Sequence, residues 1–188
     1  MTREDWINAF IAEFRPVFDS AGFPLPAKIR GTCGFPSTKA RSLDRAVGEC
    51  WSDKASSDSH FEILISPVVS EPFEVAGILV HELCHAATDG AGHKGRFVHA
   101  ARKLLLEGKP TATVIGKAFK TTFGELVDSL GDYPHATLNV NATKVTQTTR
   151  MLKAACPACG YTIRLTKKWA DLGLPDCPQD DIRLLFAD

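Results

Sequence analysis

The sequence lacks any apolar run near the roughly 18 residues that cross a bilayer, although 44% of its 188 residues are hydrophobic. Its N-terminus has the pattern of a polar, amphipathic helix and lacks the features of a secretory signal. These two absences argue against a membrane protein and against an exported one. We therefore expect a soluble, intracellular protein, in the cytoplasm or on the nucleoid. Its length fits one ordinary domain with a small appendage.

A disulfide framework is also missing from the cysteine pattern. Of the six cysteines, Cys156 and Cys159 form a Cys-x-x-Cys pair, and Cys84 stands inside an apolar helical run. This arrangement indicates metal binding and buried thiols in a reducing compartment. We expect Cys33 and Cys50, which fall on candidate strands, to be reduced thiols of the core.

Acidic residues are absent from one long part of the chain, although the net charge is zero. From Lys94 to Ala170, thirteen Lys and Arg stand against four Asp and Glu, and residues 133–170 contain no acid. Such a one-sided distribution is typical of a surface that binds phosphates. We therefore expect DNA, bound without sequence specificity, as a partner.

The run Val80-His81-Glu82-Leu83-Cys84-His85 has the spacing of a zinc hydrolase. Histidines four residues apart lie on one face of a helix, where they can bind the same ion. Glu82 stands beside them and can deprotonate a water at the metal. The flanking residues are apolar nearly all round, which predicts a buried helix over 71–89, where polar side chains need partners.

A catalytic zinc takes three protein ligands, so a third ligand is expected downstream. His93 is the favoured candidate, because the glycine-rich stretch 90–95 lets the chain turn back over the helix. The third histidine of a metzincin would fall six residues after His85, where the chain has Ala91, and this excludes that class. The alternative ligand is Glu107, at the kind of position that a gluzincin uses.

The C-terminal segment has the spacing of a zinc ribbon with one cysteine missing. Cys156 and Cys159 form the first knuckle, and Cys177 begins a second, in which Asp180 stands where cysteine is expected. Either these four residues form a Cys₃Asp structural zinc site, or the ribbon holds no metal and is maintained by packing. Asp181 is an alternative fourth ligand.

Cations and an aromatic residue surround these knuckles. Cations hold phosphates while an exposed ring stacks on a base, which is typical of sequence-tolerant single-strand binding. The candidate nucleic-acid contacts are Arg150, Lys153, Arg164, Lys167, Lys168 and Trp169. Alternatively, Trp169 belongs to the core of the ribbon.

The rest of the chain predicts an α+β domain. An aromatic side chain at every fourth position predicts a helix over 2–19 with a buried stripe. The expected strands are 28–33, 46–51 and 61–66, and the further helices are 95–106 and 123–130, separated by a linker that starts with 107–111. Two loop residues, Tyr133 and His135, are candidate donors to an oxyanion.

The motifs HELCHA and GHKGRF, followed by CPACGYTIRLTKKW, resemble the SprT-like (Spartan-type) zinc metalloproteases over nearly the whole chain. The resemblance implies a small zincin-type metalloprotease domain over 1–140 and a basic, zinc-ribbon-like β domain over 141–188. It implies an endopeptidase that cleaves DNA-bound or DNA-crosslinked proteins. By position, the family's catalytic zinc ligands fall on His81, His85 and His93, and its general base on Glu82. Asp180 departs from the family's pattern. The alternative function is a DNA-binding zinc module with little or no proteolytic activity.

Overall fold

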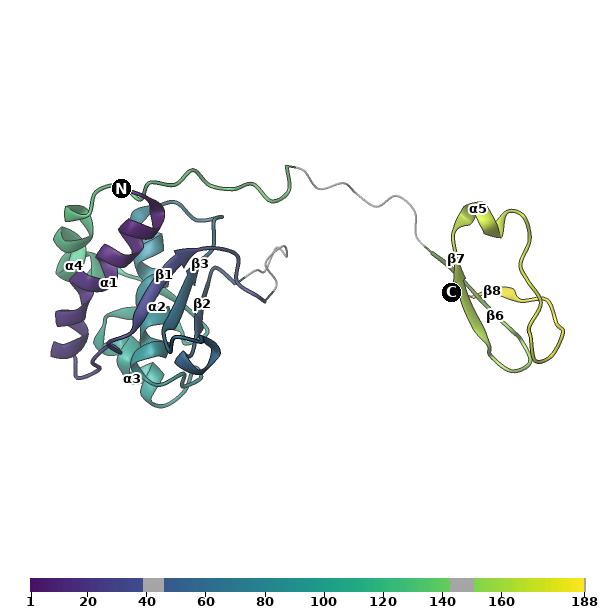
Figure 1. Cartoon of the computed structure of the whole chain (residues 1–188), viewed down its shortest axis with the longest axis horizontal. Coiled ribbons are helices and arrows are strands. Elements are labelled where there is room, and N and C mark those ends of the chain that lie inside the picture. Colours follow the sequence, from purple (N-terminus) through teal and green to yellow (C-terminus); the bar gives the residue numbers. More distant parts are fainter. Residues whose placement is uncertain (39–45, 143–150, 188) are drawn as a thin grey trace. The chain divides into compact units, whose positions relative to one another are not determined.

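The computed structural model describes residues 1–38, 46–142 and 151–187. The chain divides into two compact units, Met1–Val140 and Asn141–Asp188 (Figure 1). Each unit has its own buried cluster. Both units combine helices with small sheets, so the fold is mixed α+β, as expected. Within the described ranges, no helix is long and apolar enough to cross a membrane.

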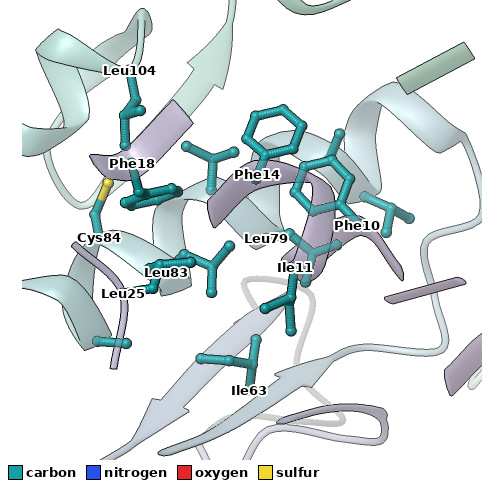
Figure 2. Close-up of a cluster of buried hydrophobic side chains, with 14 of the residues drawn as sticks. Phe10, Ile11, Phe14, Phe18, Leu25, Ile63, Leu79, Leu83, Cys84 and Leu104 are labelled. Carbon is teal, nitrogen blue, oxygen red and sulfur yellow. The ribbon is translucent and has the colours of Figure 1, made fainter. Parts of the chain in front are cut away.

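The first unit begins with helix α1 (Arg3–Ser20), which starts at a capping box. Thr2 Oγ1 accepts a hydrogen bond from the Asp5 backbone, and Asp5 Oδ2 accepts one from the Thr2 backbone. The predicted aromatic stripe is confirmed as core, because its four side chains are fully buried. Figure 2 shows three of these rings beside side chains of the next long helix. The stripe consists of Trp6, Phe10, Phe14 and Phe18.

Three strands form the main sheet, in the order β1-β3-β2. β1 (Ile29–Cys33) runs parallel to β3 (Phe61–Ile65), and β2 (Gly48–Trp51) runs antiparallel to it. A short 3₁₀ turn, η1 (Asp53–Ala55), follows β2. β2 is an edge strand of this sheet. The two strand cysteines lie on the outer strands, separated by β3, and are free thiols.

Helix α2 (Pro72–Ala87) carries the two histidines. Glu71 caps it by accepting a hydrogen bond from the Glu74 backbone at 2.6 Å. The helix ends slightly before the predicted residue, because Asp89 and Gly90 both have positive φ, 58° and 70°.

Both α1 and α2 cover the same face of the sheet. Register pairs Gly31 with Ile63, and Gly48 lies on the same face as Ile63. A Cβ on Gly31 would lie 2.1 Å from a methyl group of α1, and one on Gly48 would lie 2.6 Å from a methyl group of α2. The two glycines therefore allow the helices to approach the strands closely.

Residues 107–111 were expected to begin a linker without regular structure, and this prediction was wrong. These residues belong to a hairpin of β4 (Leu106–Lys109) and β5 (Ala112–Ile115), which follows a shortened helix α3 (Arg96–Lys103) and precedes α4 (Lys117–Ser129). Glycine, proline and lysine are poor strand formers, which hid the hairpin in the sequence. Tertiary packing holds it, since a Cβ on Gly77 of α2 would lie 3.0 Å from Ile115.

The second unit is a three-stranded antiparallel sheet of order β7-β6-β8, with a short helix α5 (Lys167–Ala170). Its strands are β6 (Leu152–Ala155), β7 (Thr162–Leu165) and β8 (Leu185–Ala187). Among the described residues of this unit, four form its buried cluster: Ala154, Cys156, Cys177 and Leu184. A core this small needs additional cross-links to be stable alone.

Candidate metal centres and cleft

The three histidines of the first unit converge through their Nε2 atoms. His93 Nε2 lies 3.1 Å from His81 Nε2 and 3.3 Å from His85 Nε2. α2 supplies the first two from one helix face, and the glycine-rich loop after it returns His93 to them. Nitrogens that each lie about 2.1 Å from one zinc in tetrahedral geometry are separated by roughly 3.4 Å. The spacing is therefore compatible with a single zinc ion.

Burial keeps these imidazoles uncharged at neutral pH. Burial, together with a smaller effect from the neighbouring imidazoles, lowers the pKa of His81 to about 4. Burial also lowers the pKa of His85 and that of His93 below the ordinary value. Neutral imidazole is the form that ligates a metal, so the cluster is prepared for an ion.

The other ring nitrogens of the two helix histidines have partners of their own. His85 Nδ1 lies 2.8 Å from the Ala91 carbonyl oxygen, which only accepts, so Nδ1 carries the proton and the Nε2 lone pair stays free. His81 Nδ1 lies 2.8 Å from Thr113 Oγ1 on β5. Such outer partners orient ligand rings. Sequence reasoning missed Thr113, because it lies just beyond residues 107–111, which were expected to begin a linker.

Phe97 of α3 supports the cluster from behind. Its ring centroid lies 4.9 Å from that of His81, 4.3 Å from that of His85 and 4.9 Å from that of His93. The side chain is fully buried. It therefore limits the rotation of all three imidazoles.

Glu82 is buried beside this cluster with 7% of its surface exposed. Burial, together with a smaller effect from the charge of Glu49, raises the pKa of its carboxyl to about 8. A Cβ on Gly48 would lie 2.5 Å from Glu82 Oε1, so only glycine at that strand position leaves room for the carboxylate.

A cleft of about 720 Å³ opens at Glu82 and two of the histidines. The cleft is lined by β2 with the residues before it (46–50), by β5 with the residue before it (111–115), and by residues of α2. β2 is an edge strand, and such an edge can hydrogen bond an extended peptide. The cleft therefore combines a binding edge with a candidate metal centre.

Other predicted residues lie elsewhere. Glu107 is outside the histidine group, with its carboxylate packed against Gly116, so the alternative third ligand was wrong. The expected oxyanion donors were also wrong. Tyr133 is buried with its ring 5.2 Å from that of Trp6, and His135 Nε2 lies 2.7 Å from a backbone carbonyl outside the cleft. Their apolar and hydrogen-bonding surroundings hold both side chains away from the histidines.

A second candidate metal group lies in the second unit and consists of Cys156, Cys159, Cys177 and Asp180. Cys156 Sγ lies 3.3 Å from Asp180 Oδ2, and the Sγ atoms of Cys159 and Cys177 lie 3.5 Å apart. Thiolates about 2.3 Å from one zinc lie roughly 3.8 Å apart in tetrahedral geometry. The four side chains are therefore arranged around one point.

The two knuckles, 156–161 and 177–182, repeat the same backbone pattern. In each, the first N–H bonds the sixth carbonyl, and the fifth N–H bonds the first carbonyl, at 2.8 to 3.0 Å. Asp180 therefore stands where Cys159 stands in the first knuckle. Asp181 takes the place of the first knuckle's glycine, with φ of 53°, and lies outside the metal group.

The candidate nucleic-acid contacts that the structure describes are spread over three elements of the second unit, β6, β7 and α5. Lys153 and Arg164 are cross-strand partners and project from one face of the sheet. Lys168 Nζ lies 5.0 Å from the centre of the Trp169 ring, which is 56% exposed and therefore outside the core. Lys167 pairs with an aspartate four residues later. Arg150 falls outside the described residues.

The fold is mixed α+β, and the first unit places a candidate metal centre beside a buried carboxyl group and an edge strand. Comparisons with protein-family models, curated proteins and solved structures found no match to the chain. The function is therefore inferred from the chemistry of the site and from the sequence motifs.

Proposed function

We propose that the chain is a zinc-dependent endopeptidase of the SprT-like type that cleaves DNA-bound or DNA-crosslinked proteins. The proposal rests on one observation above all: three Nε2 atoms converge beside the buried carboxyl group of Glu82 at a cleft. The arrangement of α1, the small sheet and α2 is compatible with a zincin-type domain. The HELCHA and GHKGRF motifs support the same family.

The residues of the site have separate roles in this proposal. His81, His85 and His93 hold Zn²⁺, which when bound polarises a peptide carbonyl and acidifies water. Glu82 accepts the proton from the attacking water and passes it to the nitrogen of the departing amine. Burial raises the pKa of this carboxyl above its ordinary range, which favours its holding the proton between the two transfers. The edge of β2 holds the substrate chain extended across the cleft.

The second unit supplies the association with DNA. A structural zinc on Cys156, Cys159, Cys177 and Asp180 would fix the two knuckles, and the nearby cations and Trp169 would bind phosphates and an exposed base. This contact would bring the protease to proteins that are attached to DNA. Backbone-directed contacts of this kind do not read sequence.

The test compares Glu82→Gln with wild type on a protein crosslinked to DNA. We expect cleavage to fall about 10²- to 10⁴-fold, since the general base is lost, while zinc content and DNA affinity are retained. Glu125→Gln, an exposed carboxylate of α4, is the matched control and should cleave normally. Equal cleavage by wild type and Glu82→Gln would overturn the proposal.

One observation favours a second function, a DNA-binding zinc module with little or no proteolysis. The cysteine group and the exposed Trp169 belong to a unit with its own buried cluster, so they could act without the cleft. That function predicts salt-sensitive DNA binding and no Glu82-dependent cleavage. A DNA affinity that is independent of salt would exclude it.

A further inference from the structure

We propose that the exposed face of α3 is a second nucleic-acid interface, which lies on the first unit and binds the phosphodiester backbone. It is formed by Arg96, His99, Arg102 and Lys103, and we call it the α3 basic face. The choice of DNA as its ligand rests on the proposed function. The three observations that support the face are its charge, the absence of ion pairs among its described residues, and its shape. They hold whether or not the chain is a protease.

The α3 basic face carries charge of one sign only. Phe97, Ala100 and Ala101 bury the opposite side of the helix, while the four residues of the face are exposed. No Asp or Glu occurs between residues 90 and 106. Helices α1 and α4 differ, because each mixes acids with bases. Part of the excess of positive charge counted between Lys94 and Ala170 therefore lies on this helix.

The cations of the face are not neutralised by neighbours. Among the residues that the structure describes, Arg96, Arg102 and Lys103 form no ion pair, whereas Arg30 and Arg183 do. A cation without a carboxylate partner keeps its full charge for an external anion. Each such contact with DNA releases condensed counterions, which favours binding at low salt.

Three of the four residues of the face line a hollow of about 350 Å³. His99, Arg102 and Lys103 line it together with Gly95 and Val98. Two basic side chains at its rim can hold one phosphate between them. Of the described residues that line it, Val98 alone has an apolar side chain, which gives little anchorage for a protein partner.

The spacing of the face favours a regular polyanion over an acidic protein. Arg96 and Lys103 are seven residues apart, about 10 Å along a helix that rises 1.5 Å per residue. DNA presents a phosphate every 3.4 Å of axis on each strand, so this span meets several of them. An acidic protein would present its charges irregularly and would need apolar anchors.

The face also has a useful position relative to the candidate metal centre. Phe97, on the other side of α3, packs against the ring of His85 at 4.3 Å between centroids. DNA on the α3 basic face would thus lie about one helix diameter, roughly 10 Å, from the histidines. A protein attached to that DNA would be within reach of the cleft.

The test measures DNA affinity of the full chain by fluorescence anisotropy over a range of salt concentrations. The probe is a labelled duplex of arbitrary sequence without attached protein. We expect Arg102→Gln with Lys103→Gln to weaken binding several-fold at low salt. The slope of log affinity against log salt should fall by about two, one for each lost phosphate contact. Glutamine keeps the helix propensity.

The matched control removes two charges elsewhere on the first unit, Lys28→Gln with Lys54→Gln, and should leave the slope unchanged. Arg96→Gln alone should lower the slope by about one, which guards against a folding defect in the double variant. Equal slopes for wild type, control and α3 variants would overturn the proposal. So would unchanged DNA affinity with weakened binding of polyglutamate, which would assign the face to an acidic protein. No cleavage is measured, so failure of the protease proposal is seen separately with Glu82→Gln.

Discussion

At the scale of single residues, the orientation of the imidazoles is set from outside the histidine cluster. The carbonyl of Ala91 fixes His85, and the hydroxyl of Thr113 fixes His81. A ligand ring that is already oriented loses little entropy when an ion binds. In the proposed zinc site, Thr113 would therefore be a positioning residue, which acts through His81.

Thr113→Val removes this hydroxyl with almost no change in shape. We expect zinc affinity to fall by about 10- to 100-fold, the usual effect of losing an outer partner of a ligand histidine. Competition with a chromogenic chelator measures the change without reference to activity. Thr113→Ser should restore the affinity, and Val114→Ala, at the exposed neighbouring position, should leave it intact. An unaltered affinity in Thr113→Val would contradict the role.

Glu82 makes the stability of the metal-free protein dependent on pH. Its pKa is raised from 4.5 to about 8 in the fold, so the folded state binds the proton more tightly than the unfolded state. This contribution to stability is complete below 4.5 and is lost as the pH rises through 8. Glu82→Gln removes the titration.

We therefore expect metal-free Glu82→Gln to be more stable than metal-free wild type above pH 8 by a few kcal/mol, since one unit of pKa corresponds to about 1.4 kcal/mol. The difference should disappear below pH 4.5. Urea unfolding at one pH on each side of this window measures it. If the free energies of unfolding of the two proteins differed equally at both pH values, the fold would not raise the pKa of Glu82, and the prediction would be wrong.

The sequence predicted some residues of the site better than others, for physical reasons. Helical periodicity alone places His81 and His85 on one face, and the glycines near His93 make its return possible. Thr113 and Gly48 could not be predicted, because each acts on a residue distant in sequence. A hydroxyl on one strand and a missing side chain on another leave no local pattern.

At the scale of elements, close contacts between strands and helices position the site. The alternation of side chains in residues 61–65 predicted the central strand β3, and the apolar run that flanks His81 predicted α2. The hairpin of β4 and β5 was missed, because its strands are held by contact with α2 and not by their own composition. The β4–β5 hairpin is thus determined by packing between elements, which the periodicity of the sequence does not reveal.

Gly48→Ala tests the contact between β2 and α2. The added Cβ would lie 2.5 Å from Glu82 Oε1 and 2.6 Å from a methyl group of Ile78. We expect a loss of about 1–3 kcal/mol in the free energy of unfolding, as overpacking usually costs, together with reduced cleavage, because the carboxylate is displaced. Urea unfolding and a peptide assay measure the two effects.

Gly31→Ala is the matched control for this experiment. Its Cβ would lie 2.1 Å from Ile7 of α1, so it should also destabilise the fold. It touches no residue of the cleft, and the folded fraction should cleave at the normal rate. If both variants lost cleavage in proportion to stability, Gly48 would have no special relation to Glu82.

At the scale of the whole molecule, the two units differ in what holds them together. The first has a large buried cluster that includes the aromatic stripe of α1, whereas the cluster of the second contains four of its described residues, two of them cysteines. If the proposed zinc binds the cysteine group, a unit with so few apolar contacts would depend on that ion for folding. Chelation should therefore affect the units unequally.

We expect two zinc ions per chain, and removal of zinc should unfold the second unit while the first stays folded. Hydrogen exchange followed by mass spectrometry resolves the two units, with fast exchange confined to peptides from 151–187.

Asp180→Ala should lower the zinc content to one and give the same exchange pattern, because the second knuckle loses a ligand. His93→Ala should also lower it to one, with the second unit still protected. Asp180→Cys restores four thiolates and should retain both ions. Two ions in Asp180→Ala would mean that three cysteines suffice, and that Asp180 occupies the cysteine position without serving as a ligand.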